Sequence, residues 1–315
     1  MLKTLVIAIL LLSPAPGYGH EDNTRPELTR HTIDVEGQAL AMWSKHPVDT
    51  KGDRGVRGVI VFLHGRTWSA LPDFDLQVPG EKRSVMDALV EQGYVTYALD
   101  LRGYGESPRD DTGWLTPDRA ADDLAAALRW VHEQSRKDGL KDRPYLFGWS
   151  MGSTVAQLSV QCHPELVSGL VLFGYWKDPD QDLPHMDAPD EPARAPNTRE
   201  NAASDFIRAE IISQKAIEAY IEASLKADPI RVDWKDTDQF NALDPALVRV
   251  PTLLLQGENG PLANTEAHAR LFSRLGHPDR QWVIIPEGTH AAILEDTLPR
   301  VVKALVGFME RGIIE

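Results

Sequence analysis

The sequence predicts an α/β fold with a mostly parallel central sheet, helices on both faces and an inserted helical cap. From residue 31 onward, short apolar runs alternate with segments of helical periodicity, the pattern of strands joined by crossover helices. The run at 58–63 is apolar almost without a break, as in a strand buried on both faces. Only the stretch 177–246 interrupts the alternation.

The expected elements follow from the position of each apolar run. The strands are 31–36 and 38–44 at the sheet edge, then 58–63, 94–99, 144–147, 167–175, 252–255 and 281–285. The helices are 83–92, one opening at 116, one opening at 150, 265–275 and 298–311. Gly93 is a plausible end for the first helix. Thr116 followed by Pro117 is a typical helix start.

The core domain is expected to comprise 20–176 and 247–315, with 177–246 as the inserted cap. This insertion is rich in Pro and Asp up to residue 200 and shows no strand pattern. A floppy surface insertion is the alternative. An ordered cap is favoured by apolar residues at helical spacing, namely Ile207, Ile211, Ile212, Ala216 and Tyr220.

The N-terminus has the pattern of a secretory signal peptide over residues 1–19. Lys3 precedes a short apolar run, and small residues follow it. A short membrane anchor or a buried first helix is the alternative, but the run is short for a bilayer span. We therefore expect a secreted or periplasmic protein with no stable membrane span after cleavage.

The composition of the chain limits which binding partners and cofactors are expected. The net charge of −14 argues against nucleic acid, because like charges repel. Cys162 is the sole cysteine, so no internal disulfide can form. The sequence has no paired cysteines and no H-E-x-x-H pattern, so no metal or other cofactor is expected. A small-molecule ester, lactone or amide is the expected partner, for the reasons below.

The strongest chemical signal is the segment 148–152, Gly-Trp-Ser-Met-Gly. It fits G-x-S-x-G and lies between an expected strand and an expected helix, as this motif requires. The glycines allow close backbone contact in a sharp turn, which exposes the Ser150 hydroxyl. Because Ser150 lies at a helix N-terminus, free N–H groups there favour developing negative charge. Ser150 is the candidate nucleophile.

A second signal is His64-Gly65-Arg66, at the end of the strand 58–63. An oxyanion hole needs two N–H donors, one from the residue after the nucleophile and one from this loop. We expect these donors to be the backbone N–H groups of Met151 and Arg66. A plain tight turn is the alternative explanation of His64-Gly65.

His290 follows the last expected strand, within Gly288-Thr289-His290. In this type of fold the catalytic base comes after the nucleophile in the chain. His290 would take the proton of Ser150 during attack. A surface histidine is the alternative, but no other histidine occupies this loop.

With these marks the chain resembles the α/β-hydrolase superfamily, from about residue 31 to the end. The shared features are His64-Gly65, the elbow at Ser150, the terminal His290 and Asp-Leu-Arg-Gly-Tyr-Gly-Glu-Ser at 100–107. The last stretch is typical of the capped branch, which includes esterases, lactonases and proline iminopeptidases. Dehalogenases and epoxide hydrolases of this branch use an aspartate nucleophile. A serine at 150 therefore implies ester, lactone or amide cleavage.

The chain departs from the family at the triad acid. The expected carboxylate position after the strand 252–255 holds Gly260. Without an acid the base loses its orienting partner, at a cost of about 10⁴ in rate in a serine hydrolase. Glu258 could reach His290 from the same loop. Asp178, and then Asp180, could serve from the end of the preceding strand. Loss of activity is the third possibility.

The expected pocket residues are four aromatic side chains near strand ends, which could line an acyl pocket or pack in the core: Trp68, Trp149, Tyr175 and Trp176. Acidic residues between 178 and 191 form a solvated face or, alternatively, a site for a substrate amino group. We expect hydrolysis of a carboxylic ester or lactone through a Ser150 acyl-enzyme. An aminopeptidase of the proline iminopeptidase type is one alternative, favoured if acidic cap residues point inward. A non-catalytic binding protein on the same fold is the other.

Overall fold

The computed structural model describes residues 25–47, 55–262 and 264–311. The expected signal peptide lies outside the described residues. No helix in the part of the chain that the structure describes is both long and apolar enough to cross a bilayer.

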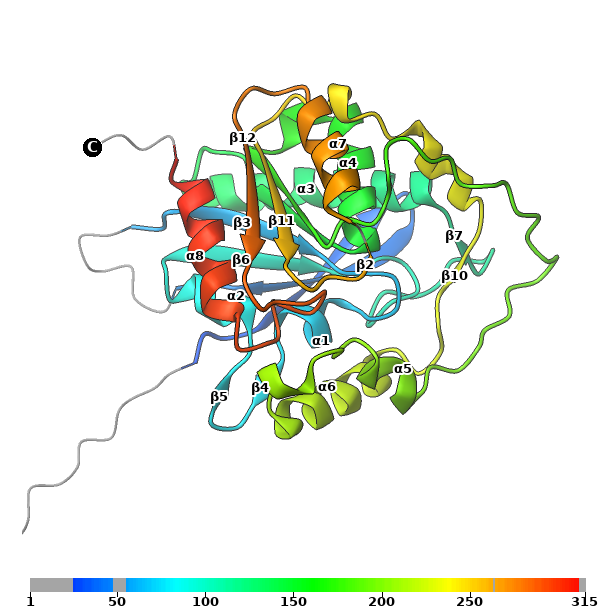
Figure 1. The fold of residues 1–315 in the computed structure, drawn as a ribbon, viewed down its shortest axis with the longest axis horizontal. Coiled ribbons are helices and arrows are strands. Elements are labelled where there is room, and N and C mark those ends of the chain that lie inside the picture. Colours follow the sequence, from blue (N-terminus) through cyan, green and yellow to red (C-terminus); the bar gives the residue numbers. More distant parts are fainter. Residues whose placement is uncertain (1–24, 48–54, 263, 312–315) are drawn as a thin grey trace, which may run out of the picture.

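The predicted sheet is present, as eight strands in the order β1-β2-β6-β3-β8-β9-β11-β12 (Figure 1). The strands are β1 (Thr29–Val35), β2 (Gln38–Lys45), β3 (Gly58–Leu63), β6 (Tyr94–Leu99), β8 (Tyr145–Trp149), β9 (Gly169–Phe173), β11 (Thr252–Gly257) and β12 (Arg280–Ile285). β2 pairs antiparallel with β1 and with β6, and the remaining pairs are parallel. The α/β class expected from the alternating pattern is therefore confirmed.

The helices begin where the sequence offers suitable caps. The Thr116 side chain accepts from Arg119 N–H at the start of the longest one, with Pro117 in its first turn. The α-helices are α1 (Ala70–Phe74), α2 (Val85–Val90), α3 (Pro117–Lys137), α4 (Met151–Cys162), α5 (Arg199–Ala203), α6 (Gln214–Ala227), α7 (Thr265–Arg274) and α8 (Leu298–Met309). Short 3₁₀ helices lie at Pro164–Leu166, Ala209–Ile211, Thr237–Ala242 and Pro245–Leu247.

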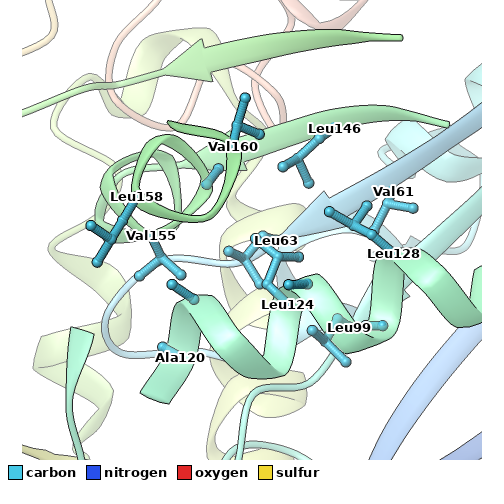
Figure 2. Close-up of a cluster of buried hydrophobic side chains, with 14 of the residues drawn as sticks. Val61, Leu63, Leu99, Ala120, Leu124, Leu128, Leu146, Val155, Leu158 and Val160 are labelled. Carbon is cyan, nitrogen blue, oxygen red and sulfur yellow. The ribbon is translucent and has the colours of Figure 1, made fainter. Parts of the chain in front are cut away.

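Each face of the sheet carries its own apolar core. One core joins inward side chains of β3, β6 and β8 to α3 and α4. In Figure 2, Leu63 lies next to Leu124 and Val61 next to Leu128, both on α3, and Leu158 and Val160 belong to α4. The other core joins the opposite sheet face to α2, α6 and α8. Burial on both faces explains the unbroken apolar runs in the central strands.

The segment 177–246 contains α5, α6 and, contrary to the sequence analysis, a strand. β10 (Asp233–Trp234) pairs in parallel with β7 (Trp114–Leu115), and both are too short to leave a periodic pattern. The short strands β4 (Gln77–Val78) and β5 (Glu81–Lys82) form a second small pair. α5 and α6 lie beyond the ends of β11 and β12 to which the arrows point (Figure 1), and α6 contacts α1.

Candidate active site

Ser150 occupies a strained turn between β8 and α4. Its backbone angles are φ 57° and ψ −122°, in a region that costs a non-glycine residue about 1–3 kcal/mol. The Ser150 N–H donates to the carbonyl of Phe173 in the neighbouring strand, at 2.9 Å. This bond to β9 fixes the turn at the sheet edge, with the serine as the residue that precedes the helix.

Two glycines make this turn possible. A β-carbon on Gly148 would lie 2.4 Å from the carbonyl oxygen of Gly152, and one on Gly152 would lie 2.2 Å from the carbonyl oxygen of His64. Both distances are far below van der Waals contact, so neither position accepts a side chain. The close approach brings the end of β3 against the start of α4.

The loop after β3 runs directly beside Ser150. A β-carbon on Gly65 would lie 3.4 Å from Cβ of Ser150. Among the described residues, the N–H groups of Arg66 and Met151 donate to no acceptor. The two expected oxyanion donors are therefore unpaired on the two segments that flank the serine.

His64 and Tyr104 hold this loop. Leu101 N–H donates to Nε2 of His64 at 3.1 Å, so Nδ1 carries the ring proton and donates to the carbonyl of Gly65 at 2.9 Å. Burial lowers the pKa of His64 to about 4, which keeps the ring neutral in this arrangement. The Tyr104 hydroxyl donates to the carbonyl of Arg66. His64 therefore has a structural task at the loop.

His290 follows β12 on a tightly packed loop. Trp149 Nε1 donates to the carbonyl of His290 at 2.8 Å, and the Nδ1–Cε1 edge of the ring lies against Gly174. A β-carbon at Gly174 would be 2.7 Å from both of these ring atoms. Burial alone lowers the pKa of His290 to about 4, so the ring is neutral at physiological pH.

Ser150 and His290, far apart in the chain, line one cavity of about 210 Å³. The structure contains no hydrogen bond between their side chains within its described residues. Catalytic hydrogen bonds are often long in a free enzyme and tighten when substrate binds. The fold therefore brings Ser150 and His290 to one site, and we expect their side chains to form the hydrogen bond when substrate binds.

Neither predicted acid reaches His290. Asp178 pairs with Arg270, with Nε of the arginine 3.1 Å from Oδ1. Glu258 accepts from the Glu287 N–H at 2.8 Å. An arginine and a backbone N–H group bind these carboxylates, and neither carboxylate makes a hydrogen bond to His290 among the described residues. The structure therefore does not support the prediction of Asp178 or Glu258 as the triad acid. Asp180 pairs with Arg274.

Two of the four predicted aromatic residues line the cavity. Trp68 and Trp149 are buried and face it. Tyr175 lines a separate, smaller cavity that His290 also lines. Trp176 packs on Phe240 with ring centroids 5.9 Å apart, so the structure assigns it to core packing.

Sequence analysis missed two aspartates in the cavity wall, Asp73 of α1 and Asp205 after α5. The Tyr220 hydroxyl lies 3.1 Å from Oδ1 of Asp73 and 3.3 Å from Oδ2 of Asp205. Burial and the neighbouring carboxylate raise the pKa of Asp73, and burial raises the pKa of Asp205 to about 6. Their only sequence signal is an acidic residue beside Phe, as in Asp73-Phe74 and Asp205-Phe206.

The acidic residues noted in the sequence lie elsewhere. Asp182, Asp187, Asp190 and Glu191 are exposed, which agrees with a solvated face. The two cavity aspartates form no ion pair with a cationic side chain in the described residues. The site thus combines a strained serine, a neutral histidine, unpaired N–H groups and two acidic side chains.

The chain is similar in sequence or fold to several known hydrolases. A 2-(acetamidomethylene)succinate hydrolase of Mesorhizobium japonicum is 24% identical over 286 residues, covering 82% of this chain and 90% of the relative. A serine hydrolase involved in carbazole degradation superposes with a TM-score of 0.61 at 18% identity, over 90% of this chain and 100% of the other. A thermophilic esterase of Thermogutta terrifontis gives 0.60 at 21% identity, over 90% and 98%.

At these identities the solved structures establish the fold alone. The family match is more specific, because the serine aminopeptidase S33 family matches residues 54–297, more than half of the chain. This range includes the elbow, the loop after β3 and His290. The chain therefore belongs to this family of α/β hydrolases and is a hydrolase.

Proposed function

We propose that the protein cleaves a carboxylic ester or lactone by acyl transfer to Ser150. The observation that carries the proposal is the strained serine, which shares a cavity with a neutral histidine and adjoins two unpaired N–H donors. Ser150 Oγ attacks the carbonyl carbon while His290 takes the hydroxyl proton. The carbonyl oxygen becomes an oxyanion, to which the N–H groups of Arg66 and Met151 donate.

The first step ends when His290 gives its proton to the leaving alkoxide and the C–O bond to the alcohol breaks, which leaves the acyl-enzyme. In the second step His290 removes a proton from water, which attacks the carbonyl carbon of the Ser150 ester. The bond from this carbon to Ser150 Oγ then breaks, His290 returns the proton to Oγ, and the acid is released. Each proton taken by His290 is returned, so the enzyme ends each cycle unchanged.

The two acidic side chains of the cavity wall disfavour an acyl group that carries a negative charge beside them, and Arg66 is the cationic residue of the same wall. The name of the curated relative gives a succinate, a dicarboxylate, as the substrate of that protein. In this chain Asp205 has a pKa of about 6 and is ionised at physiological pH. A negative charge at Asp205 repels a dianion bound near it, which supports a substrate other than a dicarboxylate for this chain.

An aminopeptidase is the second candidate, and Asp205 and Asp73 favour it. Both side chains line the cavity, and neither forms an ion pair with a cationic side chain of the described residues. They could therefore bind a substrate ammonium group. Asp205 belongs to the expected cap, and inward-facing acidic cap residues are what this alternative requires. The same Ser150 chemistry would then cleave an amide.

The nucleophile is tested with a fluorophosphonate probe and p-nitrophenyl esters of several acyl lengths. We expect Ser150→Ala to abolish both labelling and hydrolysis. Ser159→Ala, a buried serine on the same helix, is the matched control and should retain both. Hydrolysis that persists in Ser150→Ala, or none with any acyl length, would favour the non-catalytic binding protein instead.

The two substrate classes are separated by comparing a neutral p-nitrophenyl ester with an aminoacyl p-nitroanilide. If Asp205 receives an ammonium group, Asp205→Asn raises KM for the anilide about tenfold or more, as expected for a lost charged hydrogen bond. KM for the ester stays unchanged. An equal effect on both substrates would contradict the amine site.

Export is the remaining part of the proposal. The pattern of residues 1–19 supports a cleaved signal peptide. Expression of the full chain should yield a mature protein in the periplasm or medium whose N-terminus, read by mass spectrometry, lies near residue 20. A full-length protein retained with the membrane would support the anchor alternative.

A further inference from the structure

A second, small cavity is lined by His290 but not by Ser150. Its volume is about 10 Å³, close to what one water needs. The residues that line it include Gly174, Gln256, Gly260, His268 and His290. The Nδ1–Cε1 edge of His290 faces this cavity, because these two atoms lie beside Gly174.

The cavity wall includes a buried chain of hydrogen bonds. His268 Nε2 lies 2.9 Å from the carbonyl of Tyr175, which can only accept, so Nε2 carries the ring proton. Burial lowers the pKa of His268, so the ring is neutral and its Nδ1 is an acceptor. This Nδ1 lies 2.7 Å from Oε1 of Gln256, so two acceptors face each other.

The protonation of His268 therefore fixes the amide of Gln256. A neutral Nδ1 needs a donor, and rotation of the amide by half a turn supplies its NH₂ group in the same place. The carbonyl oxygen Oε1 then takes the other amide position. The amide atom of Gln256 at that position makes no hydrogen bond to any described residue. The Gln256 side chain is only 6% exposed and lines the small cavity. Gln256 thus offers an unpaired acceptor to the cavity.

We propose that Gln256 is the positioning residue for His290, with Oε1 bound to Nδ1–H through one water in the small cavity. This inference rests on the proposed function. It accounts for a base without a triad acid: an amide oxygen selects the tautomer with the proton on Nδ1, which leaves Nε2 free to accept from Ser150. Unlike a carboxylate, it adds no charge to stabilise the imidazolium ion.

The first test replaces the acceptor. We expect Gln256→Met, of similar volume, to lower kcat about tenfold or more with little change in KM, because a base held in the wrong orientation transfers protons poorly. His268→Leu removes the partner that orients the amide and should act in the same direction. Gln157→Met is the matched control, because Gln157 is also buried but lines neither cavity.

The second test is rescue from the usual acid position. A β-carbon at Gly260 would lie 3.2 Å from the carbonyl oxygen of Gly257 and near no other atom, so Gly260→Asp requires this loop to shift by a few tenths of an ångström. We expect Gln256→Met with Gly260→Asp to regain the lost kcat and to move the acid limb of the kcat/KM profile to higher pH. A purely structural role for Gln256 predicts no such rescue. Failure of the aspartate to restore kcat would overturn the proposal.

The third test needs no substrate and takes its reading from the wild-type protein. Long-range ¹H–¹⁵N NMR on the wild-type protein, with His290→Gln to assign the signal, reads the tautomer of His290. A proton on Nδ1 is expected, and a proton on Nε2 would overturn the proposal. If this tautomer is found but Ser150→Ala leaves hydrolysis and labelling unchanged, the proposed function fails while the positioning contact stands.

Discussion

The residues around His290 give its imidazole an unusual setting for a base. The ring is buried, and no carboxylate of the described residues contacts it, so nothing offsets the desolvation of its charged form. The pKa falls to about 4 as a result. A base of this kind is fully available at physiological pH, but it is a weak proton acceptor.

The pH dependence of kcat/KM should reflect this setting. His290 must be neutral to accept the proton of Ser150, so activity is lost as pH falls through its pKa. We expect the acid limb near pH 4, well below the ordinary histidine value of about 6.5. Initial rates with a neutral p-nitrophenyl ester from pH 3.5 to 8 measure the limb. A midpoint near 6.5 would contradict the burial argument.

Gly174 is a residue on which the position of His290 depends. Its φ is +59°, and a β-carbon there would lie 2.7 Å from His290 Nδ1. We expect Gly174→Ala to lower kcat at least tenfold, because the imidazole must move away from its site. Kinetics and thermal unfolding of the purified variant check this.

Gly139→Ala is the control for backbone strain. Gly139 has φ +85° with no atom within 4 Å of a β-carbon, so both variants bear the left-handed strain of about 1–2 kcal/mol. Only Gly174→Ala should lose activity. Equal kinetics in the two variants would show that His290 does not depend on the space at Gly174.

At the scale of elements, α6 is tied to the core at its C-terminal end. Asp228, the residue after this helix, accepts from the N–H groups of Ser69 and Gly105, both at 2.8 Å. Ser69 precedes α1, which carries Asp73 toward the cavity. One buried carboxylate therefore joins the expected cap to two loops of the core.

Removal of this carboxylate should destabilise the protein. Asp228→Ala leaves two N–H groups without an acceptor, at about 1–3 kcal/mol for each buried group. Urea unfolding followed by circular dichroism measures the change in the free energy of unfolding. Asp190→Ala, at an exposed position in the same segment, should change it by less than about 0.5 kcal/mol. If Asp228→Ala changed the free energy of unfolding by a similarly small amount, these two hydrogen bonds would have no structural role.

Element length decided which elements could be predicted. The sheet strands and α3, α4, α7 and α8 are long enough to show apolar periodicity or an unbroken apolar run, and the sequence prediction locates all of them. β4, β5, β7 and β10 have two residues each and exist only because a partner strand lies beside them. No local pattern encodes such a pairing, so these strands were missed.

At the scale of the whole molecule, two apolar cores lie on opposite faces of one sheet. Val61 and Leu63 point to the α3 and α4 side, whereas Ile60 and Phe62 point to the α2 and α8 side. Because alternate residues of the same strands build both cores, loss of packing on one face affects the strands that support the other. We therefore expect the described part of the chain to unfold as one unit.

Substitutions on the two faces test this coupling. Leu124→Ala on α3 and Leu305→Ala on α8 each remove a fully buried side chain and should cost about 2–5 kcal/mol. Each variant should still unfold in a single transition, with coincident near- and far-ultraviolet circular dichroism. Leu247→Ala, at a 40% exposed position, is the control. A separate early transition in either variant would show that the faces unfold independently.

The α/β class and the order of the long elements follow from the sequence, which also nominates Ser150 and His290. These inferences use apolar periodicity, a motif of five neighbouring residues and the order of residues along the chain. The surroundings of His290 and the composition of the cavity wall follow from the tertiary structure instead. Tyr220 and Asp73 lie 147 positions apart, and Asp178 and Glu258 found other partners, because folding sets the contacts of a side chain through segments distant in sequence.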